Sequence, residues 1–214
     1  MSDVAAPENE FAYGRTDWDD YEHLPTTTGL TNEKLTMWAF LGSECLLFGA
    51  LISTYLLLRN KPDDLENVGP KASELFDIPF TSVSSFVLLM SSLTMVLAVQ
   101  AIAKGDNRQT RLWIGTTATF GCIFIAGQVY EFTVFYREGL GYTTNISASA
   151  FFTLTGFHGV HVSLGIVMLA SLYILSARGR LTQKNAETVE IVGLYWHFVD
   201  IVWIVIFAIV YLIP

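Results

Sequence analysis

The chain has 214 residues, of which 52% are hydrophobic, 14% aromatic and only 15% charged. Ordinary soluble domains carry charge on about a quarter of their residues, so this composition argues against a soluble protein. The formal net charge of −8 disfavours a nucleic-acid partner, because phosphate binding needs clustered Lys and Arg. Both cysteines, Cys45 and Cys122, fall in apolar stretches, which disfavours a disulfide framework or a thiolate metal site.

The first 35 residues form a polar, acidic segment without the pattern of a cleavable signal peptide. Its acidic residues outnumber its two basic ones, Arg15 and Lys34. We interpret residues 1–35 as a solvated cytoplasmic tail. The alternative is a docking strip on a basic surface of a partner, anchored by Tyr13, Trp18 and Tyr21.

Five long apolar stretches follow, at about residues 36–58, 79–103, 112–135, 148–176 and 191–213. Each is long enough for a helix to cross a hydrocarbon core of about 30 Å, which takes about 20 residues. Open sheet or irregular backbone would leave unpaired N–H and C=O groups in lipid, so the stretches must be helices. We predict an all-α, polytopic membrane protein, with residues 36–214 forming one bundle of five transmembrane helices.

The distribution of basic residues predicts the orientation of the bundle, because Lys and Arg concentrate on the cytoplasmic side. The eight on the side of the N-terminus are Arg15, Lys34, Lys104, Arg108, Arg111, Arg178, Arg180 and Lys184. The four on the other side are Arg59, Lys61, Lys71 and Arg137. We therefore expect a cytoplasmic N-terminus and an outer C-terminus. The loops between the stretches are too short for a soluble catalytic domain, so any chemistry lies between the helices or in another protein.

Six ionisable side chains fall well inside the apolar stretches, where an unpaired charge costs about 2.5–3.5 kcal/mol on insertion scales. They are Glu44, Glu131, His158, His161, His197 and Asp200. His158 and His161 are three residues apart on one predicted helix, and His197 and Asp200 are three apart on another, at similar depth. Three histidines and a carboxylate are a conceivable metal site, but the ligand set is small. We favour a hydrogen-bonded clasp, in which neutral histidines of these two helices pair with carboxylate and hold the helices together.

Two tryptophans of the last stretch, Trp196 and Trp203, share a helix face with Val199 and Asp200. They lie deeper than interfacial anchoring requires. We expect them to pack in the core, and the alternative is a face for lipid or for a partner subunit.

Four stretches resemble one family in the same order along the chain. YWHFVDIVWIVIF (195–207) is similar to the last helix of subunit III of cytochrome c oxidase, and SECLLFGALISTY (43–55), GQVYEF (127–132) and FFTLTGFHGVHVSLG (151–165) are similar to earlier helices. They cover four of the five apolar stretches. Longer members of the family have seven helices, and this chain resembles the short bacterial form that begins at the third.

The resemblance implies a helical subunit of a haem–copper respiratory oxidase in the bacterial plasma membrane, packed against subunits I and II. It implies that haem, copper and oxygen chemistry belong to those partners, and that this chain binds no metal of its own and has no catalytic residue. It also implies bound phospholipid and a role in the stability and proton uptake of the complex. Glu44 matches the family's buried carboxylate near the proton-uptake side, Glu131 matches the glutamate of its Q-x-x-E-aromatic motif, and His158, His161, His197 and Asp200 match its buried polar residues.

Several alternatives stay open from the sequence. The partner complex is a cytochrome c oxidase or a quinol oxidase, or the chain is the related accessory protein of nitric oxide reductase. A small subunit IV or a respiratory supercomplex also stays open as a partner. An autonomous ion transporter using Glu44, His158, His161 and Asp200 is a more distant alternative, because the chain shows neither an internal repeat nor a span broken by proline.

Overall fold

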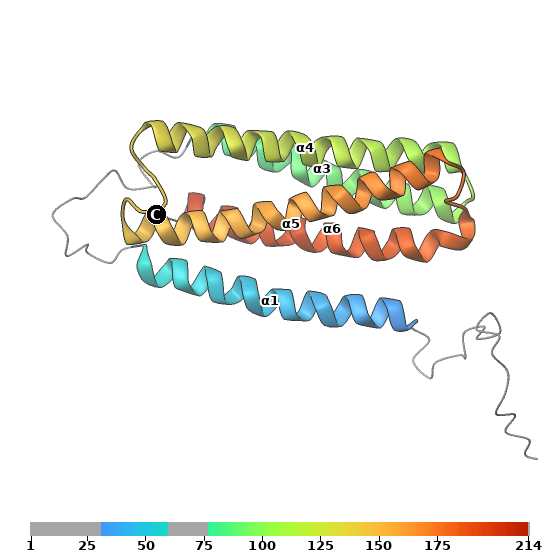
Figure 1. Cartoon of the computed structure of the whole chain (residues 1–214), viewed down its shortest axis with the longest axis horizontal. Helices are drawn as coiled ribbons and strands as arrows, with labels where there is room; N and C mark the ends of the chain where they lie inside the picture. Colours follow the sequence, from blue (N-terminus) through green and yellow to red (C-terminus); the bar gives the residue numbers. More distant parts are fainter. Residues whose placement is uncertain (1–30, 60–76, 214) are drawn as a thin grey trace, which may run out of the picture.

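The computed structural model describes residues 31–59 and 77–213, and these residues form five long helices, of which those consecutive in sequence run antiparallel (Figure 1). The helices are α1 (Asn32–Leu58), α3 (Ile78–Ala103), α4 (Asn107–Arg137), α5 (Ile146–Ala177) and α6 (Ala186–Phe207). A 3₁₀ turn, η2 (Gln183–Asn185), precedes α6, and a π-helical segment, η3 (Ala208–Leu212), continues it. Each of the five is long and apolar enough to cross a membrane, and the described residues contain no strand, which confirms the all-α, five-helix prediction. Most of the acidic tail, with its predicted docking strip, lies outside the described residues.

Polar caps and glycines define where the helices begin and end. A side-chain oxygen accepts a hydrogen bond from a first-turn N–H at the start of four helices, and these caps are Thr31, Asp77, Asp106 and Asn145. At the ends of α3, α4 and α5, a glycine adopts a positive φ, of 77°, 87° and 70° at Gly105, Gly139 and Gly179. The next residue then donates its N–H to a carbonyl five residues back, as in Asp106 N to Ala101 O at 3.0 Å.

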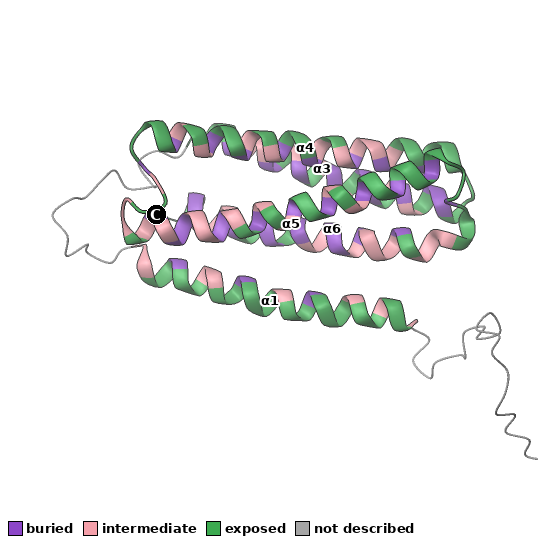
Figure 2. Cartoon of the chain, viewed as in Figure 1, coloured by how far each residue is buried: buried purple, intermediate pink, exposed green. Residues whose placement is uncertain are grey.

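The buried side chains of α4 and α5 alternate at spacings of three and four residues, the repeat of helices that pack side by side at a shallow angle. In α4 they are Thr110, Ile114, Thr117, Gly121, Phe124, Gln128, Glu131 and Phe135. In α5 the same spacing runs through Ala148, Phe151, Thr155, His158, Val162, Gly165, Leu169, Leu172 and Ser176. Figure 2 shows these buried positions on the faces turned toward the other helices. A bundle with one continuous core follows from this repeat.

The indole of Trp196 lies at the centre of the bundle and is fully buried. It projects from α6 between glycines of two other helices. A Cβ atom at Gly121 of α4 would lie 2.6 Å from Trp196 Cη2, and one at Gly165 of α5 would lie 2.8 Å from Trp196 Cε3. Its Nε1 donates to Ser91 Oγ of α3 at 2.9 Å. The four helices can therefore meet at this depth only because both glycines lack a side chain.

Helix α1 packs against α5 and α6 through a narrower contact than the other helices make. Its buried residues are Leu41, Phe48 and Tyr55, one every seven residues, so a single stripe of the helix faces the bundle. Near its start, Lys34 Nζ lies 2.8 Å from Glu190 Oε1 of α6, and the Thr31 hydroxyl donates to Glu187 of the same helix. Most of the remaining surface of α1 is exposed in this chain (Figure 2).

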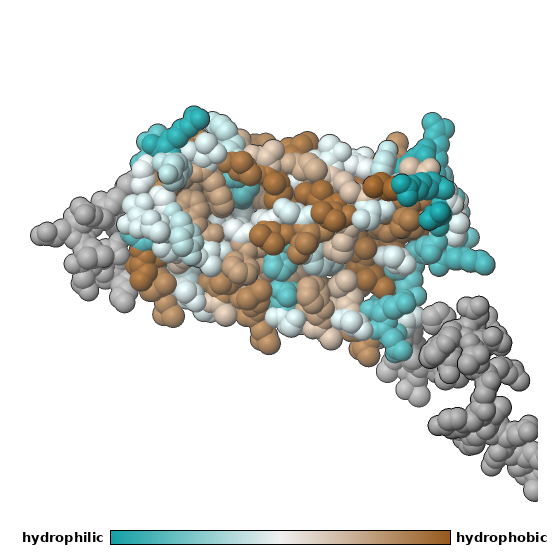
Figure 3. Space-filling view, viewed as in Figure 1, coloured by the Kyte–Doolittle hydropathy of each residue, from teal (hydrophilic) through white to brown (hydrophobic). Residues whose placement is uncertain are grey.

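The outer surface of the bundle is apolar in the middle and hydrophilic at both ends (Figure 3). Large apolar side chains such as Leu46, Leu57 and Val167 are more than half exposed there, as expected where lipid or other membrane helices replace water. The arrangement of the helices brings the start of α1 to the same end as the connections 104–106 and 178–182 (Figure 1). The cytoplasmic location of that end stays a prediction from the charge distribution.

We expect Gly165→Ala to destabilise the protein by about 1–3 kcal/mol, the usual effect of overpacking a tight core. The added methyl group would lie 2.8 Å from the Trp196 ring, which is fully buried. The matched control is Gly159→Ala in the same helix, where the added Cβ meets nothing within 4 Å. The measurement is the melting temperature of the purified protein in detergent. Equal melting temperatures for the two variants would contradict the role of Gly165.

Candidate functional site

A histidine–carboxylate pair joins α1 to α5 inside the membrane-spanning part of the bundle. His161 Nε2 lies 3.1 Å from Glu44 Oε2, and both side chains are mostly buried, with 12% and 14% of their surfaces exposed. His161 Nδ1 lies 2.8 Å from the backbone oxygen of Phe157. Sequence reasoning singled out both residues but did not pair them.

The hydrogen-bond partners of His161 determine where its hydrogens lie. A backbone carbonyl only accepts, so Nδ1 must carry a hydrogen that it donates to Phe157 O. The contact between Nε2 and Glu44 Oε2 then needs one more hydrogen, either on the imidazole or on the carboxyl group. In both states, one proton lies between the two side chains. The pair is therefore a site that can hold and release a proton.

Neighbouring residues hold this pair in place. The ring of Phe48 lies edge-on to His161, with 5.0 Å between ring centroids. The hydroxyl group of Tyr195 on α6 donates to the backbone oxygen of His161 at 2.9 Å. Helices α1, α5 and α6 thus all contribute to the surroundings of the proton-holding pair.

His158, one turn before His161, lies in a box of aromatic rings. Its imidazole stacks on Trp203 with ring centroids 4.9 Å apart, and it meets Phe124 edge-on at 5.9 Å and Phe48 at 6.4 Å. The box joins α1, α4, α5 and α6. The His158 side chain is fully buried, and neither ring nitrogen has a hydrogen-bond partner among residues 31–59 and 77–213. Its role in this chain is therefore that of an aromatic ring in the core.

Serine hydroxyls of α3 bind polar atoms of α6 at three levels. Trp196 Nε1 donates to Ser91 Oγ at 2.9 Å, Trp203 Nε1 donates to Ser85 Oγ at 2.8 Å, and His197 Nδ1 lies 2.6 Å from Ser92 Oγ. Both tryptophans are buried in the core, with 0% and 1% exposed, which favours helix packing over a lipid-facing or partner-facing role. Sequence reasoning singled out the two tryptophans but did not pair them with serines of α3.

The predicted clasp between the two histidine-containing helices is wrong in its partners. His161 turns to Glu44 on α1, and His197 turns to Ser92 on α3, so no histidine of α5 bonds to α6 through its ring. Asp200 is 3% exposed, and no histidine of the described residues bonds to its carboxyl group. The reason is geometric, because His158 lies in the buried repeat of α5, whereas His161 lies one position outside it and faces α1.

A second buried carboxylate, Glu131 of α4, accepts hydrogen bonds at both of its oxygens. The hydroxyls of Thr81 and Tyr211 donate to its Oε1 at 3.0 and 3.1 Å, and Gln128 Nε2 donates to its Oε2 at 3.2 Å. Thr81 belongs to α3 and Tyr211 to η3, so the cluster joins three parts of the bundle near one membrane surface. Gln128 is visible from sequence as a neighbour one turn away. Thr81 and Tyr211 are not, because their contacts are long-range.

The described residues contain no group of three or more His, Cys, Asp or Glu side chains that could share a metal ion. Glu44 and His161 form one pair, Glu131 lies in a separate cluster, and His158, His197 and Asp200 belong to neither. The ring nitrogens of His161 are both engaged in hydrogen bonds. This donor set fits helix contacts and proton binding better than metal coordination.

Comparison with known proteins agrees with the resemblance found in the motifs. A sequence model of the family described as cytochrome c oxidase subunit III matches residues 20–213. A protein of Bacillus sp. (strain PS3) named cytochrome c oxidase subunit 3 is 42% identical over 181 residues, which cover 85% of this chain and 86% of the relative. A probable quinol oxidase subunit 3 of Staphylococcus saprophyticus is 41% identical over 84% of this chain and 88% of the relative. The cytochrome c oxidase subunit 3 of Bacillus subtilis (strain 168) is 38% identical, over 85% and 86% of the two chains.

Proposed function

Because this chain belongs to the cytochrome c oxidase subunit III family, it is subunit III of a haem–copper oxidase, and we propose that it supports the complex without a catalytic centre of its own. The observation that carries the proposal is the pairing of its intramembrane polar side chains with one another and with serine, threonine and tyrosine hydroxyls. These contacts join helices, and the Glu44–His161 contact also holds a proton. The oxygen chemistry then belongs to the partner subunits.

Subunits I and II are the proposed partners, and they hold the haems and copper. The exposed apolar side chains along α1, including Trp38, Leu46 and Leu57, provide a broad surface for membrane helices or lipid. A small subunit IV or a supercomplex partner fits the same kind of surface, and bound phospholipid covers what protein leaves open. The relatives are bacterial, which supports the bacterial plasma membrane as the location of this integral membrane protein.

Glu44 is the proposed contribution of this subunit to proton uptake. Its carboxyl group shares one proton with His161 of α5, and Glu44 itself lies on α1, the helix with the smallest buried contact to the other described helices. A proton on this pair can leave without breaking the core that Trp196 organises. These properties suit a group that exchanges protons with a neighbouring subunit.

We propose cytochrome c as the electron donor, with the quinol oxidase subunit and the accessory protein of nitric oxide reductase as the alternatives. The proposal rests on the stretches GFHGVHV and YWHFVD, which resemble the cytochrome c branch. The identities of 42% and 41% to a cytochrome c oxidase subunit and to a probable quinol oxidase subunit do not separate the two donors.

We expect the complex purified through a tag on this chain to contain haem and to show the electron paramagnetic resonance signal of the dinuclear copper centre of subunit II. That centre accepts electrons from cytochrome c, so its signal identifies the donor. A haem-containing complex that lacks the copper signal and oxidises quinol would replace cytochrome c with quinol. A tagged chain that purifies without haem would overturn the assignment of partners.

We expect Glu44→Gln to slow turnover of the complex, or to shorten the time for which it stays active, while assembly stays intact. The glutamine amide can donate to His161 Nε2 and so preserve the link between α1 and α5, but it cannot release a proton. The measurement is oxygen consumption of the purified complex over repeated turnover. The matched control is Ser43→Ala, an exposed neighbour whose hydroxyl donates to Phe40 O of its own helix. Kinetics equal to the wild type in a fully assembled Glu44→Gln complex would leave Glu44 with a packing role alone.

A further inference from the structure

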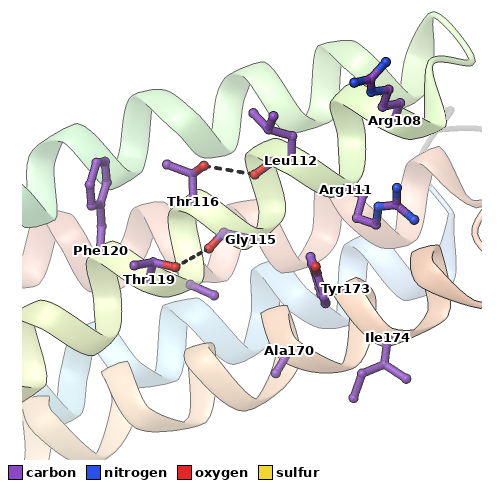
Figure 4. A pocket seen from close by; sticks show the side chains of 11 residues that line it. Arg108, Arg111, Leu112, Gly115, Thr116, Thr119, Phe120, Ala170, Tyr173 and Ile174 are labelled. Atoms are coloured by element: carbon purple, nitrogen blue, oxygen red, sulfur yellow. Dashed lines mark hydrogen bonds between the residues drawn. The ribbon is translucent and has the colours of Figure 1, made fainter.

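The outer seam between α4 and α5 contains an open groove of about 790 Å³ that the contacts described above do not use (Figure 4). Small residues on both helices create it. Gly115 of α4 faces Tyr173 of α5, where an added Cβ atom would lie 3.1 Å from the Tyr173 ring, and Ala170 lines the groove one turn away. The groove opens on the surface that faces lipid in a membrane.

Apart from the Tyr173 hydroxyl and the two arginines, the walls of the groove present mainly hydrocarbon. The hydroxyls of Thr116 and Thr119 donate to Leu112 O and Gly115 O of their own helix, at 3.0 and 2.8 Å, as Figure 4 shows. Their hydrogens are therefore already used, and Leu112 and Ile174 complete the apolar lining. Such a surface favours a flexible hydrocarbon chain as its occupant.

The length of the groove matches one leaflet of a bilayer. It runs along α4 from Arg108 to Phe120, which is about 18 Å at the rise of an α-helix. Half of a hydrocarbon core of about 30 Å is about 15 Å. A chain lying in the groove would therefore start at the membrane surface and end near the bilayer midplane.

Two arginines lie at the surface end of the groove. Arg108 and Arg111 both line it and are exposed, and Figure 4 places their side chains at the end away from Phe120. In the described ranges of the chain, no carboxylate pairs with either guanidinium. Asp106, the nearest acidic residue in sequence, uses its Oδ1 to cap α4 by accepting from Arg108 N and Gln109 N. The two guanidiniums thus offer planar donor sets that match a phosphate group.

We propose that this groove binds one phospholipid with an anionic headgroup, whose phosphate contacts Arg108 and Arg111 and whose acyl chain lies along Gly115 and Ala170. An apolar helix of another subunit would fill the walls but leave both arginines without a counter-charge. Free inorganic phosphate would neutralise the arginines but leave the apolar walls uncovered. The proposal rests on the proposed function, since it assigns one of the lipid sites of the assembled oxidase.

The test is native mass spectrometry of the purified oxidase complex, titrated in detergent with dioleoyl phosphatidylglycerol or, for comparison, dioleoyl phosphatidylcholine. We expect the double variant Arg108→Gln/Arg111→Gln to bind phosphatidylglycerol about tenfold more weakly at this site, because it loses two charge-assisted contacts. The matched control is Arg178→Gln/Arg180→Gln, which removes two exposed arginines at the same end of the bundle but outside the groove. We expect this control to bind the lipid as the wild type does.

A second variant, Ala170→Phe, fills the apolar part of the groove and leaves both arginines in place. We expect it to lose the same lipid, which distinguishes a phospholipid from inorganic phosphate. Unchanged phosphatidylglycerol binding in the arginine variant, or equal loss in the Arg178/Arg180 control, would overturn the site. Loss of a protein subunit instead of lipid from Ala170→Phe would show that a partner helix occupies the groove and would also overturn it. The same spectra report subunit composition, so a failure of the proposed assembly is separate from a failure of the lipid site.

Discussion

The rest of the structure depends on one buried indole. Trp196 projects from α6 into the space that Gly121 and Gly165 leave open, and its Nε1 bonds to Ser91. One side chain therefore sets the distance between α6 and the three helices around it. In a membrane, apolar surface alone does not draw helices together, because lipid is as apolar as leucine. Close fit and a satisfied hydrogen bond at the same residue supply what hydrophobicity cannot.

The polar side chains extend this principle outward from the centre. Hydroxyls of α3 bind the indoles of α6, Glu131 collects donors from α3, α4 and η3, and Glu44 binds His161 across α1 and α5. Each such contact contributes about 0.6–2 kcal/mol in a membrane bundle. Helix α1 depends on them most, because only one stripe of it is buried. The pair that can hold a proton is thus also one of the contacts that attach the outermost helix, which links proton binding to the attachment of α1.

Much of this arrangement could be predicted from the sequence, because length and hydropathy require five spanning helices. The alternating spacing in α5 even contains the information that separates His158 in the core from His161 facing α1. The spacing of three between the two histidines suggested instead that they act together. The partners of these residues could not be predicted, since Ser92 and Glu44 lie 105 and 117 residues away from His197 and His161. Such contacts depend on the rotation of each helix about its axis, which composition does not determine. The groove at Arg108 and Arg111 was missed for the same reason, because its two walls come from different helices.

The central claim is that His161 and Glu44 hold one proton between them while His161 Nδ1 donates to the Phe157 carbonyl. The most direct test is nitrogen-15 nuclear magnetic resonance of the complex with labelled histidine, in which the His161 signals are identified by their absence from His161→Gln. The structure predicts a protonated Nδ1 and an Nε2 whose resonance changes when Glu44 is replaced by glutamine. A His161 ring with a bare Nδ1, and with an Nε2 resonance indifferent to Glu44, would contradict it.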